Sequence, residues 1–270
     1  MRKAARGSFF PVRLPRMPVR RFYALAVFAV MAALPAAAVD PADEWLAKAR
    51  AFLGAESALN AVKSLHFEGS IDTVERVPDP TDATKSIERP LHLAIDIVFQ
   101  KPMQQRQILR SDKVERTTTL DGFDGWERVS DRTGQNKPRI ILLDLSNIKR
   151  LRATTVENLS FYAKQDQDSR QVRLLGDVTV DGLACVKLSF THGNGIDFLR
   201  TFDKSTGRLI KTEIQSGGEI REEGEMFVSG IRFPRKVLDK TVDGIVTVIS
   251  FDKVTVGERF PAEAFAVPPL

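Results

Sequence analysis

The chain has few of the residues that most enzymes use for catalysis or for binding metal ions. Its 270 residues include one cysteine and three histidines. Cys185 cannot form an internal disulfide, and its place in an alternating apolar run predicts an inert, partly buried thiol. His66, His92 and His192 lie in two strand-like runs and one turn. None has a cysteine neighbour or the i, i+4 histidine partner of common metal sites, so structural or solvated histidines are expected.

Sequence motifs of the common enzyme classes are also missing. The chain contains no G-x-S-x-G, no phosphate-binding loop and no H-E-x-x-H. Asp121, Asp124 and Glu127 surround a glycine turn, but their spacing does not fit a calcium-binding loop, and a plain Asp-Gly turn is favoured. We therefore expect a protein that is not an enzyme, with no catalytic residues, no metal site and no cofactor.

A surplus of positive charge is confined to the first 38 residues. This segment holds seven of the 40 basic residues and none of the 35 acidic ones. The remainder of the chain thus has 33 basic and 35 acidic residues, although the formal net charge of the whole is +5. Nucleic-acid binding depends mainly on cations that contact phosphates. No nucleic-acid partner is therefore expected.

Long hydrophobic runs are scarce. The longest, at residues 22–34, has 13 residues, against the roughly 20 that a membrane-spanning helix needs. It follows Arg20 and Arg21 and precedes Ala36-Ala37-Ala38, the pattern of a cleavable signal peptide. We expect cleavage before Val39, export to the periplasm, and no transmembrane helix in the mature chain.

Turn residues at near-regular intervals divide residues 171–256 into short alternating runs. The pair Asp181-Gly182 predicts a hairpin, since a two-residue turn of this kind needs positive φ at both positions. In the run that follows, Val186, Leu188 and Phe190 share one face. A further apolar face, residues 196–202, is interrupted by Arg200. These patterns predict an antiparallel sheet with one buried face.

Further strands and three helices are expected in the first half of the chain. Strands are predicted at about 65–74, 91–99, 103–109, 114–120 and 126–129, with a proline-containing loop at 78–88. Helices are predicted at 40–53, 56–64 and 144–163.

The third predicted helix carries an apolar face, and it provides the candidate binding residues. Ile148, Leu151, Leu159 and Tyr162 lie three or four positions apart, which places them on one face. Trp126 follows a turn and fits either a core position or a ligand-stacking position. The candidate cavity or lid residues are therefore Trp126, Ile148, Leu151, Leu159 and Tyr162.

Several segments together identify a family resemblance. They are residues 49–54 (A-R-A-F-L-G), 61–65 (A-V-K-S-L), 67–69 (F-E-G), 202–209 (F-D-K-S-T-G-R-L), 228–234 (V-S-G-I-R-F-P) and 265–268 (F-A-V-P). Their order resembles that of the LolA/LolB-like superfamily of periplasmic lipoprotein carriers. The chain is longer than the best-known carriers around residues 78–88 and 130–165.

The resemblance implies one α+β domain over residues 39–270. Its fold would be a curved antiparallel sheet that forms an incomplete β-barrel capped by helices. The expected function is non-enzymatic binding of a lipid or lipoprotein acyl chain in an apolar cavity, with a possible protein partner in the cell envelope. The alternative is an envelope scaffold or protein-interaction module of the same fold with a packed interior. An open cavity would favour the carrier, and a filled one the scaffold.

Overall fold

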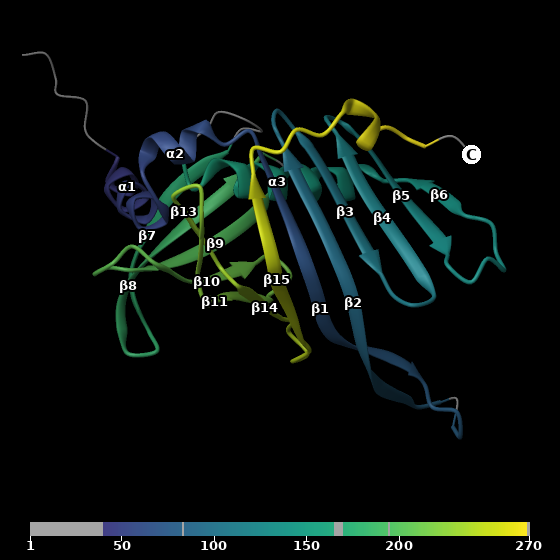
Figure 1. Ribbon diagram of the computed structural model, residues 1–270. Helices are drawn as coiled ribbons and strands as arrows, with labels where there is room; N and C mark the ends of the chain where they lie inside the picture. The colour runs from purple at the N-terminus through teal and green to yellow at the C-terminus, as the bar shows by residue number, and fades with distance from the viewer. Residues whose placement is uncertain (1–39, 83, 165–169, 194, 269–270) are drawn as a thin grey trace, which may run out of the picture. The chain divides into compact units, whose positions relative to one another are not determined.

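One antiparallel sheet of 13 strands forms the main part of the fold (Figure 1). The computed structural model describes residues 40–82, 84–164, 170–193 and 195–268, so the predicted signal segment lies outside the described residues. In spatial order the strands are β6 (Arg139–Leu142), β5 (Asp124–Asp131), β4 (Val114–Asp121), β3 (Gln104–Arg110), β2 (Ser86–Gln100), β1 (Ser64–Pro78), β15 (Val246–Val256), β14 (Lys236–Lys240), β11 (Glu219–Glu223), β10 (Leu209–Ile214), β9 (Ile196–Asp203), β8 (Leu183–His192) and β7 (Gln171–Val180). The sheet is not closed, because β6 and β7 are its two edges. The expected fold class, an open antiparallel sheet with helices, is confirmed.

Strands from the two ends of the chain meet at the centre of the sheet. Strand β1 pairs with β2 on one side and with β15 on the other. The pairing with β15 shifts at a bulge between Glu68 and Gly69. A side chain at Gly69 would meet the backbone of Ser250, whose carbonyl oxygen lies 1.9 Å from the ideal Cβ position. Only glycine fits this close approach.

The hairpin of β1 and β2 is longer than predicted. The ladder continues to the pair Pro78 with Ser86, where the sequence predicts a loop from 78 to 88. Pro90 lies inside β2, opposite Val74. Proline is tolerated there because β3 pairs with β2 only from Ala94 onward, so the missing N–H faces an open edge. Figure 1 shows this arm extending past the neighbouring strands.

The predicted Asp-Gly hairpin is confirmed. Asp181 and Gly182 have φ angles of 51° and 80°, and they join β7 directly to β8. Positive φ at both positions matches the twist of the flanking strands. Val186, Leu188 and Phe190 are fully buried on one face of β8, as the alternation predicts.

Three helices pack against the sheet, close to the predicted positions. Helix α1 (Pro41–Leu53) is capped by Asp40, which accepts a hydrogen bond from the Ala42 N–H at 2.9 Å. Helix α2 (Glu56–Ala61) ends earlier than the predicted 56–64, because β1 already begins at Ser64. No helix in the described ranges is long and apolar enough to cross a membrane.

Helix α3 (Leu145–Ser160) lies within the predicted 144–163 and contacts β2, β3 and β4. Asp144 caps its first turn by accepting a hydrogen bond from the Asn147 N–H at 2.8 Å. The β-branched Thr155 is accommodated because its hydroxyl donates to the Leu151 carbonyl at 2.8 Å. We call the sheet face that α3 covers the inner face.

Two small elements complete the described structure. Strands β12 (Met226–Val228) and β13 (Ile231–Phe233) form a separate hairpin. The C-terminal segment contains the short 3-10 helix η2 (Ala262–Ala264) and returns to the sheet. There Phe265 is fully buried, and its carbonyl accepts a hydrogen bond from the Trp126 indole at 2.9 Å.

Candidate functional site: an apolar cavity beneath helix α3

A cavity of about 400 Å³ lies between α3 and the inner face of the sheet. Strands from both halves of the chain contribute to it, because alternate residues of each strand point to the same face. Most of the lining side chains are apolar: Leu53, Leu65, Phe67, Ile97, Phe99, Phe161, Phe198, Leu209, Ile220, Phe233, Val237, Ile249 and Phe251.

Aromatic rings form a continuous part of the cavity wall. The Phe67 ring lies 6.3 Å from the Phe99 ring and 5.9 Å from the Phe233 ring, both edge to face. It also lies 4.9 Å from Phe251 in a tilted arrangement. Such pairs stabilise one another beyond their burial. The rings of this wall therefore pack against one another and do not fill the cavity.

A buried charged cluster borders the cavity. Glu157 on α3 contacts Arg170, His192 and Arg200, and all four side chains are at least nine-tenths buried. One carboxylate oxygen of Glu157 lies 2.6 Å from Arg170 Nε and 2.8 Å from His192 Nε2. The other oxygen accepts a hydrogen bond from Arg200 Nη1. Of these four residues, Glu157 and Arg200 also line the cavity.

The cluster keeps Glu157 ionised. Burial alone would raise the pKa of its carboxyl, but attraction to Arg200, the hydrogen bond with His192 and attraction to Arg170 lower that pKa to about 2. The Arg200 guanidinium also lies over the rings of Phe190 and Tyr162, at 4.7 Å and 5.0 Å from their centroids. The Phe198 ring lies 5.7 Å away, so Arg200 is held by one carboxylate and three rings. This end of the cavity is therefore charged, and its charges contact one another.

Glu222 brings a second carboxyl into the cavity. It lies on β11 and lines the cavity, and no hydrogen bond or ion pair involves its side chain within the described part of the chain. Glu222 is exposed at the opening of the cavity, yet the protein atoms that surround its carboxyl partly desolvate it and raise its pKa, and attraction to Arg200 opposes that shift. The residue remains accessible to water, because the cavity beside it is open. Glu222 is therefore a carboxyl without an ion-pair partner among the described residues that a molecule in the cavity would meet.

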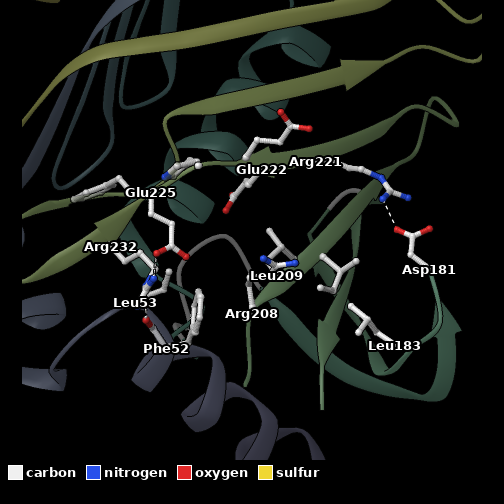
Figure 2. Close-up of a pocket in the computed structure, with 15 residues that line it drawn as sticks. Phe52, Leu53, Asp181, Leu183, Arg208, Leu209, Arg221, Glu222, Glu225 and Arg232 are labelled. Atoms are coloured by element: carbon white, nitrogen blue, oxygen red, sulfur yellow. Dashed lines mark hydrogen bonds and ion pairs between the residues drawn. The ribbon is translucent and has the colours of Figure 1, made fainter. Parts of the chain in front are cut away.

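The cavity borders an outer groove of about 550 Å³ (Figure 2). The groove lies where β10 and β11 separate, since only two residue pairs join these strands. Six residues line both spaces: Leu53, Leu209, Glu222, Arg232, Phe233 and Pro234. The groove and the cavity are therefore neighbouring spaces that share part of one wall.

Two ion pairs flank the groove. Figure 2 shows Arg221 paired with Asp181, at 2.5 Å, and Arg232 paired with Glu225. Arg208 also lines the groove, and its side chain forms no hydrogen bond or ion pair with any described residue. The groove is therefore much more polar than the cavity.

One of the five candidate binding residues lines the cavity, and four lie elsewhere. Tyr162 is a lining residue. Leu159 belongs to the core beside the cavity, whereas Ile148 and Leu151 pack against a cluster of Met103, Leu120 and Val156. Trp126 is buried against the C-terminal segment.

The cavity side of α3 is its polar flank. Thr154, Glu157 and Asn158 line the cavity, next to the apolar stripe that the sequence identifies. In the sequence, Arg200 is the residue that indicates a buried charged cluster, because a charged residue on an apolar strand face needs a buried partner. The sequence does not identify that partner, Glu157.

The three histidines have different surroundings. His192 belongs to the buried cluster, His66 lies 2.8 Å from Glu258 and 3.3 Å from Asp96, and His92 is exposed beside Asp72. In the residues that the structure describes, no group of three or more His, Cys, Asp or Glu could hold a metal ion.

These features define a class of proteins in which an open antiparallel sheet holds an apolar cavity beneath a helix. Solved structures share this fold. A LolA superfamily protein from Nitrosomonas europaea matches with a TM-score of 0.54 and 14% identity, over 84% of this chain and 97% of that one. A DUF1329 family protein from Desulfovibrio piger matches with a TM-score of 0.50 and 14% identity, over 84% and 98%. The chain therefore has a LolA-like fold.

A more distant match covers a similar length. A putative outer membrane lipoprotein-sorting protein domain from Vibrio parahaemolyticus has a TM-score of 0.45 and 10% identity, over 83% of this chain and 97% of that one. No protein-family model and no curated protein sequence matches the chain.

Proposed function

We propose that the protein is a non-enzymatic carrier that binds the acyl chain of a lipid or lipoprotein in the cavity beneath α3. The observation that carries this proposal is the cavity itself, with about 400 Å³ of space and walls of Phe, Leu, Ile and Val. This volume falls within the roughly 300–1,000 Å³ of typical ligand sites. The predicted signal peptide would place this activity in the periplasm.

The physical basis is burial of hydrocarbon. Each CH₂ group that leaves water contributes about 0.8 kcal/mol, so an acyl chain gains affinity with every carbon inside the cavity. The polar end of the cargo would stay in the outer groove, beside Arg208 and the ion pairs of Arg221 and Arg232. The opening between β10 and β11 would let one molecule occupy both spaces.

An envelope scaffold is the alternative. A scaffold of this fold gains stability from a filled interior, because an empty apolar cavity loses packing contacts. The open cavity supports the carrier over this alternative. A protein partner in the envelope remains compatible with either function.

A cavity-filling substitution tests the proposal. Val237 and Leu238 are neighbours on β14 and point to opposite faces, and only Val237 lines the cavity. We expect Val237→Trp to weaken binding of a fluorescent acyl probe at least tenfold, while Leu238→Trp binds it like the wild type. Circular dichroism of both variants checks that the sheet is intact. Equal binding by the two variants, or no binding by the wild type, would contradict the carrier.

A further inference from the structure

Four large apolar side chains are exposed together, away from the cavity. Phe123 is 76% exposed, Ile141 45%, Leu142 73% and Leu145 65%. The Leu143 N–H donates to the Gly125 carbonyl at 2.9 Å, which holds the end of β6 beside the turn that carries Phe123. We call these four residues the β6 patch.

Cationic side chains flank the β6 patch. Lys137 and Arg139 precede the exposed residues of β6, and Lys149 and Arg150 follow on the first turns of α3. Lys149 lies four positions after Leu145, so the two share one helix face. None of these four cations has an ion-pair partner among the residues described. Their charges are therefore available to an external partner.

Other charged residues beside the β6 patch leave its surroundings with more positive than negative charge. The Arg152 guanidinium lies 3.9 Å from the centre of the Phe123 ring and donates to the Gly122 carbonyl at 2.6 Å. Three acids are nearby. Asp144 caps α3, Asp121 accepts a hydrogen bond from Gln104, and Asp124 lies in the same turn as Phe123. Leaving aside Arg152 and the paired Glu127 and Arg116, the four cations named above exceed these three acids by one charge, whereas the chain beyond residue 38 is net negative.

The shape of the β6 patch favours a lipid surface over a protein strand. Ile141 and Leu142 are consecutive in an edge strand, so they point to opposite faces of the sheet, and both are exposed. A partner strand added to this edge would cover the backbone, but it would leave one or both side chains in water. A lipid interface surrounds an inserted edge and can take up side chains from both faces at once.

We propose that the β6 patch docks the protein on an anionic phospholipid bilayer surface. The apolar side chains enter the boundary between headgroups and acyl chains, and the flanking cations contact lipid phosphates. Insertion stays at this boundary, because the outer backbone groups of β6 need water or headgroups as hydrogen-bond partners. The protein would thereby reach the membrane without a spanning helix. This inference is independent of whether the cavity carries a cargo.

Vesicle flotation of the purified protein tests the proposal. We expect binding to phosphatidylcholine vesicles that contain phosphatidylglycerol, much weaker binding to pure phosphatidylcholine, and loss of binding at high salt. The double variant Leu142→Ser, Leu145→Ser should bind at least tenfold more weakly. The matched control is Phe227→Ser, Val242→Ser, since these two apolar residues are 62% and 75% exposed on other elements. The control should float like the wild type.

Variants of the flanking cations test the electrostatic contribution to vesicle binding separately from the apolar contribution. Lys149→Glu, Arg150→Glu should reduce binding to anionic vesicles at least tenfold, whereas Lys85→Glu in the loop between β1 and β2 should not. The cavity variant Val237→Trp should still float, which distinguishes docking at the β6 patch from cargo uptake. The proposal fails if the wild type does not float, or if patch and control variants float equally. It also fails if the patch variants keep full binding to vesicles and lose only their cross-linking to a protein of the cell envelope.

Discussion

Glu157 on α3 and Arg200 on β9 form an ion pair across 43 positions of the chain. Their side chains are 3% and 10% exposed. The pair ties α3 to β9, although the helix packs mainly on β2, β3 and β4. It therefore joins the two halves of the sheet at one end of the cavity.

Removing the charge of Glu157 should strongly destabilise the protein. In Glu157→Gln the guanidinium groups of Arg170 and Arg200 stay buried without a carboxylate partner. Breaking a buried ion pair in this way costs about 3–5 kcal/mol, which urea unfolding would measure. The control is Glu68→Gln, because Glu68 pairs with Lys253 on the surface. That change should cost less than about 1 kcal/mol. Equal losses would show that the cluster contributes no more than a surface pair.

Glu157 should also make stability depend on pH in the acid range. Its pKa falls from an ordinary 4.5 to about 2 in the folded protein, where the neighbouring Arg200, His192 and Arg170 outweigh the cost of burial. A lowered carboxyl pKa stabilises the fold fully above 4.5, and this contribution is lost as pH falls from 4.5 towards 2. We expect the unfolding free energy of the wild type to fall over this range. Glu157→Gln should show a clearly shallower slope, and parallel curves would contradict the assignment.

Local patterns in the sequence predict much of the sheet and the helices. The Asp181-Gly182 turn depends on backbone preferences at two adjacent residues, and the structure shows both with positive φ. The burial of Val186, Leu188 and Phe190 follows from alternation within one strand. Helix α1 begins after a capping Asp40 and ends at Gly54. In each case the deciding interactions lie within a few residues.

The cavity depends on contacts between distant segments, which the sequence does not display. The apolar stripe of α3 predicts which face is buried, yet Ile148 and Leu151 pack on the sheet, and the neighbouring polar flank borders the cavity. Whether a buried face encloses space depends on how the sheet curves beneath it. The long arm of β1 and β2 was also missed, because the prolines, aspartates and threonines of residues 78–88 indicate a loop, whereas the ladder continues to the pair Pro78 with Ser86.

The centre of the sheet should be sensitive to one methyl group. In Gly69→Ala the new Cβ would collide with the Ser250 carbonyl at the β1–β15 bulge. We expect a loss of at least about 3 kcal/mol, the upper end of the usual cost of overpacking. Gly122→Ala is the comparison, because that glycine sits in a turn between two strands and has no atom within 4 Å of its Cβ position. Its φ of +63° should limit the cost to about 1–2 kcal/mol. Thermal or urea unfolding would rank the two variants, and the reverse order would contradict this role of Gly69.

Ionisation of Glu222 should weaken cargo binding, provided that the cavity carries an acyl chain. Partial desolvation by the surrounding protein atoms raises the pKa of this carboxyl, with Arg200 acting in the opposite direction. Below its raised pKa the group is neutral and tolerates a neighbouring hydrocarbon. As pH rises through that pKa, the carboxylate needs water that an acyl chain would displace. Glu157 stays ionised throughout, since its pKa is about 2. The change in affinity is therefore assigned to Glu222.

We expect a neutral probe, such as a fluorescent monoacylglycerol, to bind roughly tenfold more weakly once Glu222 is ionised, which corresponds to about 1.4 kcal/mol. A neutral probe is needed because a fatty acid would itself titrate. Glu222→Gln should bind the probe equally well across the same pH range. The control is Glu223→Gln, because Glu223 lines the groove but not the cavity, and it should keep the pH dependence of the wild type. A pH dependence that survives Glu222→Gln would place the responsible group elsewhere.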